Sequence, residues 1–286
     1  MYNYSFIIPH KNCPDLLQRC VDSIPERDDV QVIVVDDNSD EGKKPALKNR
    51  KNLQVILLDV SQSKGAGRAR NIGLKHAEGK WLLFPDSDDY YMEGFIDVLD
   101  SYIYGNKDVV YFGFIHRDGV SGEDMYNLDF QKYILEYNES KESVDQIRFQ
   151  IKNPWIKMVS HAYIDKYTIR FEEVPNGNDI LFSLKVGYYT QNIQIEKSSL
   201  YVYLRNDNSI LTSKETVEAA LCRLTHLIKI NNFYSFIGYS YWKRSFLKYI
   251  LSKIVSLKWP FVIALCKNFI RIFKERNEWV KMFSAK

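Results

Sequence analysis

The sequence predicts an α/β fold, with a mostly parallel sheet flanked by helices, followed in the chain by a helical C-terminal extension. Three observations lead to this prediction. Short apolar, β-branched runs alternate with helical patterns through the first half of the chain, as they do when parallel strands are joined by helices. Acidic and polar residues follow several of these runs, where open sheets of this class bind ligands. From about residue 214 onward, the sequence reads as helices.

Each element of the first half is a separate prediction. Short apolar runs bounded by polar or turn-forming residues predict strands at 4–9, 30–37, 53–60, 81–89 and 108–115. Helical periodicity predicts helices at 13–24, 67–79 and 93–103. The first of these helices has one apolar face, formed by Leu16, Leu17, Cys20, Val21 and Ile24. Gly79 is expected to end the second.

The second half is less regular. Mixed patterns run from about residue 119 to about residue 207 and include a β-rich stretch at 193–204. We expect a first domain over 1–213, with halves at 1–118 and 119–213, and a helical extension over 214–286. Because no repeat, low-complexity tract or flexible linker separates them, the extension is expected to pack directly on the first domain.

Composition excludes several classes of protein. The four cysteines lack the paired short spacing of zinc sites and disulfide frameworks, and the five histidines show no metal-ligand spacing. The first residues contain no basic region followed by a long apolar run, so no secretory signal is expected. No window approaches 18 consecutive apolar residues, so no membrane span is expected. A reducing cytoplasm is the expected location.

Charge is divided unevenly along the chain. Residues 241–286 contain 11 Lys and Arg against 2 Glu, whereas the preceding residues contain 28 basic and 34 acidic side chains. Two oppositely charged regions suggest two different partners. Nucleic acid could bind the basic region, but no recognition motif supports this, and none is expected as a partner.

Carboxylates close two of the expected strands. Asp36 and Asp37 follow the second strand, and Asp86, Asp88 and Asp89 follow the fourth. Such carboxylates repel one another unless cations or hydrogen-bond donors offset them. Asp86 and Asp88 could direct oxygens at one hard cation, Mg²⁺ or Mn²⁺, which would neutralise a departing diphosphate. Taken alone, an acidic turn is the simpler interpretation. A second cluster on another strand end favours a site.

The glycine- and arginine-bearing stretch GAGRARNIG matches neither common nucleotide motif. The dinucleotide fingerprint needs a glycine where this chain has Arg70. The P-loop needs four residues between its glycines, but five separate Gly73 from Gly79, and Trp81 follows Lys80. What remains is a loop opening a helix, with arginines near the sheet edge where a diphosphate could bind. An ordinary basic helix start is the alternative.

Four segments in order resemble the successive signatures of family 2 glycosyltransferases, which have the GT-A fold. They are SFIIPHKN, VIVVDDNSDE, GAGRARNIGLKHAEGKWLLFPDSDD and NGNDILFSLKVG. Their order and spacing match over roughly residues 4–210, most strongly in the first 95. Each segment is weak evidence alone, but four in order are specific. The resemblance implies inverting transfer of a sugar from a nucleotide diphosphate donor, expected to be a UDP-sugar, to an acceptor hydroxyl.

The resemblance also implies that 1–118 is the nucleotide-binding half and 119–213 the acceptor-binding half. The donor site is expected at the ends of the expected strands and at the start of the 67–79 helix. The implied nucleotide-sugar-binding residues are Pro9, His10, Asn12, Asp36, Asp37, Ser39, Gly67, Arg70, Asn71, Asp86 and Ser87. Mn²⁺ or Mg²⁺ would be held by Asp88 and Asp86, and Asp89 could share this role. Lys11 replaces the aromatic residue that is usual in the first loop of the family.

The catalytic base of the family is the Asp of a Glu-Asp pair, which maps to Asp179, with Asn178 in place of the Glu. An inverting transferase needs one carboxylate to take the acceptor proton and a cation at the leaving diphosphate. A helix N-cap is the alternative role of Asp179. Trp155 could stack on an acceptor sugar or lie in the core. Arg205 could lie near the diphosphate or on a surface hairpin. Trp155, Asn178 and Arg205 are the acceptor-site candidates.

Residues 241–286 interleave Trp and Phe with Lys and Arg, and Pro260 is expected to kink this helical region. Such helices lie in the interface of anionic membranes, or they pack on their own domain or on another subunit as a homo-oligomer. We favour membrane contact, which would place the protein peripherally at the inner face of a cell membrane.

Together, these observations predict a metal-dependent hexosyl- or N-acetylhexosaminyltransferase. It would act on a glycan or lipid-linked acceptor in the synthesis of lipopolysaccharide or another cell-surface polysaccharide. A sugar nucleotidyltransferase is one alternative, but residues 9–12 lack the Gly-rich loop expected after its first strand. A non-catalytic membrane- or partner-binding module with a decayed nucleotide site is another, because Lys11 and Asn178 depart from the family pattern.

Overall fold

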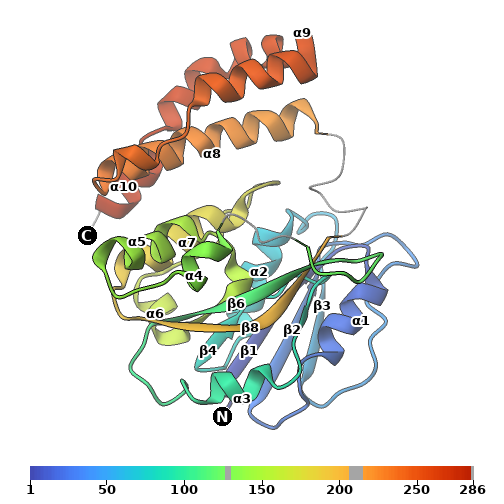
Figure 1. Ribbon diagram of the computed structural model, residues 1–286. Coiled ribbons are helices and arrows are strands. Elements are labelled where there is room, and N and C mark those ends of the chain that lie inside the picture. Colours follow the sequence, from blue (N-terminus) through green and yellow to red (C-terminus); the bar gives the residue numbers. More distant parts are fainter. Residues whose placement is uncertain (126–129, 206–214, 285–286) are drawn as a thin grey trace. The chain divides into compact units, whose positions relative to one another are not determined.

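A computed structural model describes residues 1–125, 130–205 and 215–284. The chain forms two compact units (Figure 1). Unit 1 contains Met1–Val174 and Asn178–Ser209, and unit 2 contains Pro175–Gly177 and Ile210–Lys286. The boundary predicted at residues 213 and 214 lies outside the described residues.

Unit 1 is built on an eight-stranded sheet in the order β3-β2-β1-β4-β7-β6-β8-β5. The strands are β1 (Tyr4–His10), β2 (Val30–Asp36), β3 (Leu53–Leu57), β4 (Trp81–Leu83), β5 (Tyr90–Tyr91), β6 (Val109–Asp118), β7 (Lys157–Ser160) and β8 (Ile193–Arg205). The pairs β1–β2, β1–β4, β2–β3 and β6–β8 are parallel. The pairs that β7 makes with β4 and β6, and the β5–β8 pair, are antiparallel. The sheet is therefore mixed, with its parallel half where the sequence predicted it.

Helices flank this sheet (Figure 1). They are α1 (Pro14–Asp22), α2 (Ala66–His76), α3 (Phe95–Asp100), α4 (Gln131–Leu135), α5 (Lys141–Gln150), α6 (His161–Lys166) and α7 (Asn178–Tyr189). Local chemistry explains several starts. Pro14 occupies the first turn of α1, where its missing N–H costs nothing. The Ser140 and Ser160 side chains cap α5 and α6 by accepting backbone hydrogen bonds.

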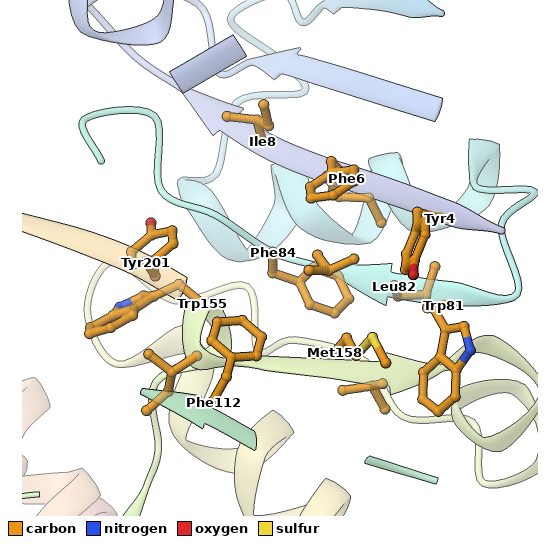
Figure 2. Close-up of a cluster of buried hydrophobic side chains, with 14 of the residues drawn as sticks. Tyr4, Phe6, Ile8, Trp81, Leu82, Phe84, Phe112, Trp155, Met158 and Tyr201 are labelled. Atoms are coloured by element: carbon orange, nitrogen blue, oxygen red, sulfur yellow. The ribbon is translucent and has the colours of Figure 1, made fainter. Parts of the chain in front are cut away.

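The core of unit 1 lies against the sheet and is rich in aromatic rings (Figure 2). All seven residues of β1 and of β2 are buried, as expected for strands covered on both faces. Phe84 makes edge contacts with Phe171 and Phe182, whose rings stack at 3.9 Å. This cluster fixes the segment that follows β4 against the start of α7, and both segments carry candidate site residues.

Two expected strands are shorter than predicted. The strand predicted at 81–89 ends at Leu83, and an irregular segment and the acidic turn follow it. Pro85 explains this, because it has no backbone N–H to donate to a sheet. The strand predicted at 53–60 ends at Leu57 and lies at the sheet edge. There Val55 and Leu57 are 40% and 56% exposed, so these two residues of the apolar run are not buried.

Unit 2 is helical, as the sequence predicted for the end of the chain. It contains α8 (Val217–Phe236), a 3₁₀ turn (Ser240–Trp242), α9 (Phe246–Glu275) and α10 (Glu278–Ser284). α9 is two helical segments separated by a kink at Lys258, which has φ 55° and ψ −145°. Pro260 follows two residues later, so the predicted interruption at this proline is confirmed.

One helical stretch of unit 2 bears on the prediction about membrane spans. By length and composition alone, Ser240–Ile272 could cross a membrane: an 18-residue window within it has a mean hydropathy of 1.5, and 6% of that window is buried. The prediction counted only uninterrupted apolar residues, and Lys253 and Lys258 divide the apolar run. Length and composition do not distinguish a span from an exposed apolar helix.

Candidate active site

The acidic turn after β4 is tied to β8 through its third carboxylate. Asp89 is fully buried and accepts hydrogen bonds from the Tyr201 hydroxyl and the Leu204 N–H, both at 2.8 Å. The Tyr201 hydroxyl also accepts a bond from the Asp86 N–H at 3.0 Å. Burial, followed by the neighbouring charges of Asp88 and Asp86, raises the pKa of Asp89 well above its usual range. Asp89 therefore anchors the acidic turn to β8 from the buried side of the turn.

The other carboxylates of the turn are less deeply buried. Asp86 forms an ion pair with Arg70, and Asp88 is partly buried. The Asp88 carbonyl accepts a hydrogen bond from Arg19 at 2.9 Å. Ser87 is buried, and its hydroxyl lies 3.3 Å from the Cys13 sulfur. The turn is thus held by α1, α2 and β8, and its first and third residues keep partial access to solvent.

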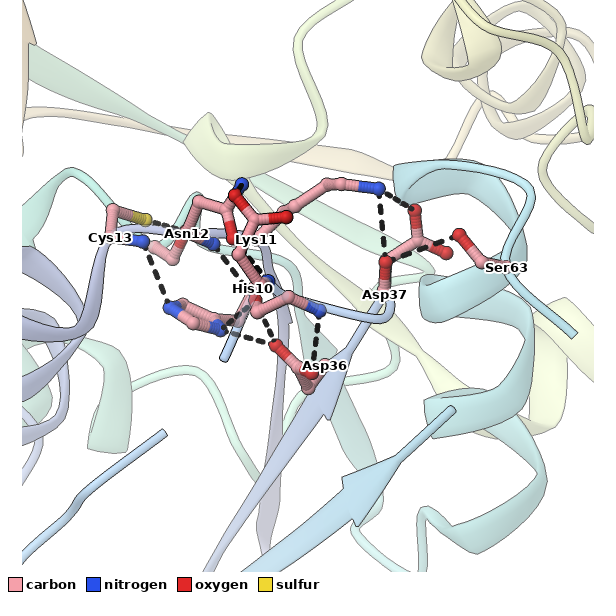
Figure 3. A network of polar contacts seen from close by, with 10 residues as sticks. His10, Lys11, Asn12, Cys13, Asp36, Asp37 and Ser63 are labelled. Carbon is pink, nitrogen blue, oxygen red and sulfur yellow. Dashed lines mark hydrogen bonds and ion pairs between the residues drawn. The ribbon is translucent and has the colours of Figure 1, made fainter. Parts of the chain in front are cut away.

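The loop after β1 is joined to the loop after β2 by a buried histidine (Figure 3). His10 is 1% exposed, and its Nδ1 lies 2.7 Å from the Asp36 carboxylate. Its Nε2 accepts a hydrogen bond from the Cys13 N–H at 3.2 Å. This pattern assigns the neutral tautomer, in which Nδ1–H donates to Asp36. The Asp36 carboxylate also accepts from the Ser39 N–H and hydroxyl.

Asn12 adds hydrogen bonds between the same two loops. Its backbone lies in the left-handed region, with φ 60°. Its N–H donates to the Ser39 hydroxyl at 2.9 Å, and its side-chain amide exchanges hydrogen bonds with Asp40 at 2.8 and 3.0 Å. Asn tolerates this backbone conformation better than most residues. Pro9, the residue before His10, is buried within β1. Most of the polar side chains in these two loops that were predicted to bind the nucleotide-sugar therefore hydrogen-bond to one another.

Asp37 holds the loop that leads into α2 (Figure 3). Its two carboxylate oxygens accept hydrogen bonds from the N–H groups of Lys64 and Gly65 at 3.1 and 3.0 Å. Its carbonyl accepts from Lys11 and Ser63, each at 3.1 Å. Gly65 has φ 85°, which favours glycine at this position. The second carboxylate cluster and the glycine-bearing stretch are therefore neighbours in the fold.

Arg70 of α2 connects the acidic turn with the start of α7. Its guanidinium pairs with Asp86 and donates to the Asn178 side-chain oxygen at 2.9 Å. It also lies over the Phe171 ring, 5.3 Å from the centroid. Arg70 is 5% exposed. A buried arginine held by a carboxylate, an amide and a ring is a fixed positive charge, and it stands between the two candidate catalytic regions.

Two more residues of α2 bring the helix close to the 171–173 segment. The Asn71 side chain exchanges hydrogen bonds with the backbone of Phe171, each at 2.9 Å. A Cβ added to Gly67 would lie 2.1 Å from the Glu172 carbonyl oxygen and 2.8 Å from the Asn178 Cβ. Only a glycine permits this approach. Gly67 and Asn71 thus place the start of α7 beside α2.

Asp179 lies in the first turn of α7 and is partly buried. The helix begins at Asn178, so Asp179 is inside the helix and not at its N-cap, although a carboxylate is still favoured there by the helix dipole. Burial raises the pKa of Asp179, and the nearby Arg70 opposes this rise. A carboxylate whose pKa is raised toward neutrality is a better proton acceptor than an ordinary aspartate.

A buried lysine accompanies Asp179. Lys157 of β7 is fully buried, and its ammonium donates to the Ile151 carbonyl and the Ser183 hydroxyl, each at 3.2 Å. Ser183 is one helical turn after Asp179 on α7. Burial lowers the pKa of Lys157 to about 7, while Asp179 opposes this effect. The sequence did not point to Lys157. It left Asp89 as a residue that could share the metal-binding role, and it gave no sign that both Asp89 oxygens accept hydrogen bonds from β8.

The described residues contain no group of three or more His, Cys, Asp or Glu side chains arranged to hold a metal ion. Two carboxylates of the acidic turn nevertheless keep partial access, those of Asp86 and Asp88. Magnesium ions in nucleotide enzymes use one or two carboxylates and take their remaining ligands from substrate phosphates and water. The donor set of this turn fits that class of site.

The comparison with protein families identifies the chain. The model of "Glycosyl transferase family 2" matches residues 5–168, which is more than half of the sequence. The chain belongs to glycosyl transferase family 2. The matched range contains the histidine network, the acidic turn and Arg70, whereas Asp179 lies beyond it.

Relatives and solved structures agree with this assignment to family 2. The chain is 27% identical over 211 residues to the poly(ribitol-phosphate) β-N-acetylglucosaminyltransferase TarS of Staphylococcus aureus, covering 71% of this chain and 35% of TarS. It thus spans about a third of that relative. The TarS 1–349 structure in complex with UDP-GlcNAc matches with a TM-score of 0.58 and 20% identity, over 99% of this chain and 79% of that one.

A second solved structure shows the same fold. The mannosyltransferase PcManGT of Pyrobaculum calidifontis, in complex with GDP-Man and Mn²⁺, matches with a TM-score of 0.55 and 14% identity, over 99% of this chain and 84% of that one. The predicted GT-A fold is therefore confirmed for this family 2 chain. At sequence identities of 20% and 14%, these two structures support the fold alone.

The acceptor candidates are scattered in the fold. Trp155 is 3% exposed and packs against Phe114, Tyr201 and Tyr203 in the core (Figure 2). As it lies, this indole presents almost no surface to a sugar. Arg205 is exposed at the end of β8. The Asn178 side chain is hydrogen-bonded to Arg70, which pairs with Asp86 of the acidic turn.

Proposed function

We propose that this family 2 chain is an inverting glycosyltransferase that moves a hexosyl or N-acetylhexosaminyl group from a UDP-sugar to an acceptor hydroxyl. The observation that carries the proposal is the Arg70 bridge, which joins the acidic turn through Asp86 to the start of α7 through Asn178. The bridge brings a carboxylate region suited to a diphosphate together with a carboxylate suited to proton removal. Support for the UDP-sugar comes from the UDP-GlcNAc complex of the TarS structure.

The proposed chemistry divides roles between two carboxylate regions. Asp179 would take the proton of the acceptor hydroxyl as its oxygen attacks the anomeric carbon. Arg70 would keep Asp179 ionised despite its burial, because a nearby cation favours the carboxylate. The His10–Asp36 and Asp37 networks would hold the nucleotide loops rigid. Preformed loops lose less entropy when the donor binds.

A divalent cation, Mn²⁺ or Mg²⁺, is part of the proposal. Asp88 and Asp86 would hold it, and when bound it would supply charge neutralisation at the leaving diphosphate. Asp89 would position these residues, because both of its oxygens accept bonds from β8. The Mn²⁺ complex of PcManGT supports a metal in this fold.

We also propose a role in cell-surface polysaccharide synthesis, on a glycan or lipid-linked acceptor. The support is the name of the TarS relative, which acts on poly(ribitol-phosphate). A surface polymer is made at a membrane, so we propose a peripheral location at its inner face, through residues 241–286. Assembly as a homo-oligomer is compatible with this proposal but is not required by it.

Thermal unfolding with nucleotides tests the donor site. The protein is melted with UDP, GDP and their sugars, each with and without Mn²⁺. A ligand present at 100 times its dissociation constant stabilises by about 2.7 kcal/mol. We expect stabilisation by UDP and a UDP-sugar that requires Mn²⁺, is lost in Asp88→Ala and is kept in Asp97→Ala, a change at an exposed position in α3. No shift with any nucleotide and metal would overturn the donor-site proposal.

A further inference from the structure

The α9 helix is apolar on two sides, and one of them packs on α8. Phe261 and Ile272 of α9 are buried together with Leu224 and Ile228 of α8. The Tyr249 hydroxyl donates to the Ala220 carbonyl at 3.0 Å, which adds a polar contact. This side of α9 has its partner within unit 2.

The other side of each of the two α9 segments is exposed. The segments run out and back along α8, because Asn231 and Asn232 of α8 donate to the carbonyls of Arg244 and Arg276, which flank α9. The exposed apolar residues of α9 are Leu247 (62%), Leu251 (63%), Ile254 (38%), Val255 (79%), Trp259 (75%), Ile263 (53%), Phe269 (50%) and Ile270 (69%). Before the kink, these residues follow the spacing i, i+4, i+7 and i+8, which places them on one helix face. Isolated exposed apolar residues are ordinary, but a row of large ones along a helical segment marks an interaction surface.

Basic residues border this apolar row. The exposed cations of α9, the turn before it and α10 are Lys243, Arg244, Lys248, Lys258, Lys267, Arg271, Lys274, Arg276 and Lys281. Of the two acidic residues of this region, Glu278 pairs with Lys229 of α8, and Glu275 pairs with Lys229 and with Arg271, which leaves the other cations in excess. The exposed side of α9 therefore combines apolar side chains with an uncompensated positive charge.

We propose that the exposed apolar and basic side chains of α9 bind the interface of an anionic lipid bilayer, with the two segments of α9 lying in the plane of the membrane. Large apolar side chains bordered by Lys and Arg are the chemistry by which interfacial helices bind such membranes. A second copy of the chain fits less well, because a symmetric contact would place two positive faces against each other. The inference rests on the proposed peripheral location but not on the transfer chemistry.

The kink at Lys258 supports a helix that lies on the membrane instead of crossing it. The backbone of Lys258 leaves the helical region and α9 reverses there, so both ends of α9 lie beside neighbouring residues of α8. Neither segment alone offers the run of about 20 apolar residues that a membrane-spanning helix needs. Lys258 is exposed at this kink, and lysine can reach the headgroups from an interfacial helix.

Vesicle flotation of the full chain, without donor or acceptor, tests the proposal. We expect binding to vesicles of phosphatidylcholine and phosphatidylglycerol, weaker binding to phosphatidylcholine alone, and loss of binding in high salt. The paired change Leu251→Gln and Val255→Gln should weaken binding at least tenfold, since two apolar side chains no longer enter the interface. The matched control, Ser252→Gln and Ser256→Gln on the same exposed stretch, should change binding less than twofold.

Tryptophan fluorescence reports which face binds. Trp81, Trp155 and Trp279 are buried, whereas Trp259 is 75% exposed. Anionic vesicles should shift the emission to the blue, and Trp259→Phe should abolish most of the shift while retaining binding. Circular dichroism and melting temperature verify that each variant is folded.

Four results would overturn the membrane proposal without touching the donor-site proposal. They are no binding to anionic vesicles, equal binding to neutral ones, resistance of the bound protein to carbonate extraction, and dimers that shift Trp259 emission without lipid. Carbonate resistance would indicate a membrane span, and the dimers would indicate a contact between copies. Conversely, vesicle binding by a chain that no nucleotide stabilises would leave this inference standing and remove the proposed function.

Discussion

The Tyr201 hydroxyl donates a 2.8 Å hydrogen bond to Asp89, and so fastens the acidic turn after β4 to the strand β8. The two residues are 112 positions apart. An acidic turn loaded only with repelling carboxylates would be unstable. Here one carboxylate is withdrawn into the fold and serves as an acceptor, while Asp86 and Asp88 stay partly accessible. The geometry of the proposed diphosphate site thus depends on a distant strand.

Asp89→Ala is expected to lower the free energy of unfolding by about 2–4 kcal/mol, because it leaves the Leu204 N–H and the Tyr201 hydroxyl without their buried acceptor. Asp89→Asn, which keeps one acceptor oxygen, should lose less. Urea unfolding at pH 7 measures both. The exposed control Asp97→Ala should change stability by about 0.5 kcal/mol or less. An Asp89→Ala protein as stable as the wild type would show that the bonds to β8 do not hold the turn.

Asp179→Asn is expected to lower kcat by about 10²- to 10⁴-fold, the usual contribution of a general base. Donor binding should stay within a few fold, because the substitution leaves the acidic turn and Arg70 in place. Steady-state kinetics and calorimetric titration with the UDP-sugar separate the two effects. Stability at pH 7 should not fall, since burial penalises the ionised Asp179 carboxyl. Retained turnover in the Asn variant would remove Asp179 from the base role.

The same carboxyl predicts a pH profile. Its pKa is raised by burial, and a base must be deprotonated to work. The rate should therefore fall as the pH drops through this raised pKa, at a higher pH than for an ordinary aspartate near 3.9. The kcat/KM profile between pH 4 and pH 8 measures the acid limb. A flat profile down to about pH 4.5 would contradict the assignment.

Lys157 predicts a rise of stability with pH. Its pKa is lowered to about 7 in the folded protein, whereas in the unfolded chain it is near 10.4. Between these values, the unfolded chain binds the proton and the folded one does not, so stability increases as pH rises. The wild type should gain about 2 kcal/mol relative to Lys157→Met between pH 7 and pH 9. Urea unfolding of both proteins at the two pH values gives this difference. Equal pH dependence would mean that the folded lysine stays protonated.

Gly67→Ala should destabilise the protein, although Gly→Ala in a helix ordinarily stabilises by up to about 1 kcal/mol. The added Cβ would lie 2.1 Å from the Glu172 carbonyl oxygen, so α2 and the start of α7 must separate. We expect a loss of about 1–3 kcal/mol, typical of overpacking, together with lower kcat. Thermal unfolding and kinetics measure the two. Gly105→Ala is the milder comparison, because its added Cβ would lie 3.3 Å from the Tyr102 carbonyl oxygen, a tight contact that a shift of a few tenths of an ångström relieves. Full activity of Gly67→Ala would show that this approach is not needed.

The sequence correctly predicted the elements whose apolar pattern fits only one type of secondary structure. The continuous apolar runs of β1 and β2 are buried strands, as expected. The strand predicted at 81–89 failed after Leu83, because apolar periodicity took no account of the missing donor at Pro85. The antiparallel β7 was not predicted, since its four residues include a lysine, and lysine is rarely buried.

The sequence pointed to many of the residues of the candidate site, but it predicted few of their contacts. Motif order pointed to His10, Asp36 and Arg70, and the structure places them at neighbouring strand ends and helix starts. No local pattern could show that Asp89 turns inward, that Arg70 reaches Asn178 at a separation of 108 positions, or that Lys157 lies under α7. These facts depend on tertiary contacts across the sheet. The predicted roles of Asp88 and Asp179 stay predictions until the experiments above are done.

The exchange of two hydrogen bonds between Asn71 and the Phe171 backbone has a consequence for protein engineering. This exchange is one of several contacts that dock the 119–213 half, proposed to bind the acceptor, onto the 1–118 half; the others include the Arg70–Asn178 and Tyr201–Asp89 bonds and the shared sheet. A chimera that imports a foreign acceptor half must therefore import a compatible 171–173 segment as well. Swaps joined ahead of this segment should fold and turn over. Swaps that cut behind it would leave the new base misplaced, however well its own pocket were chosen.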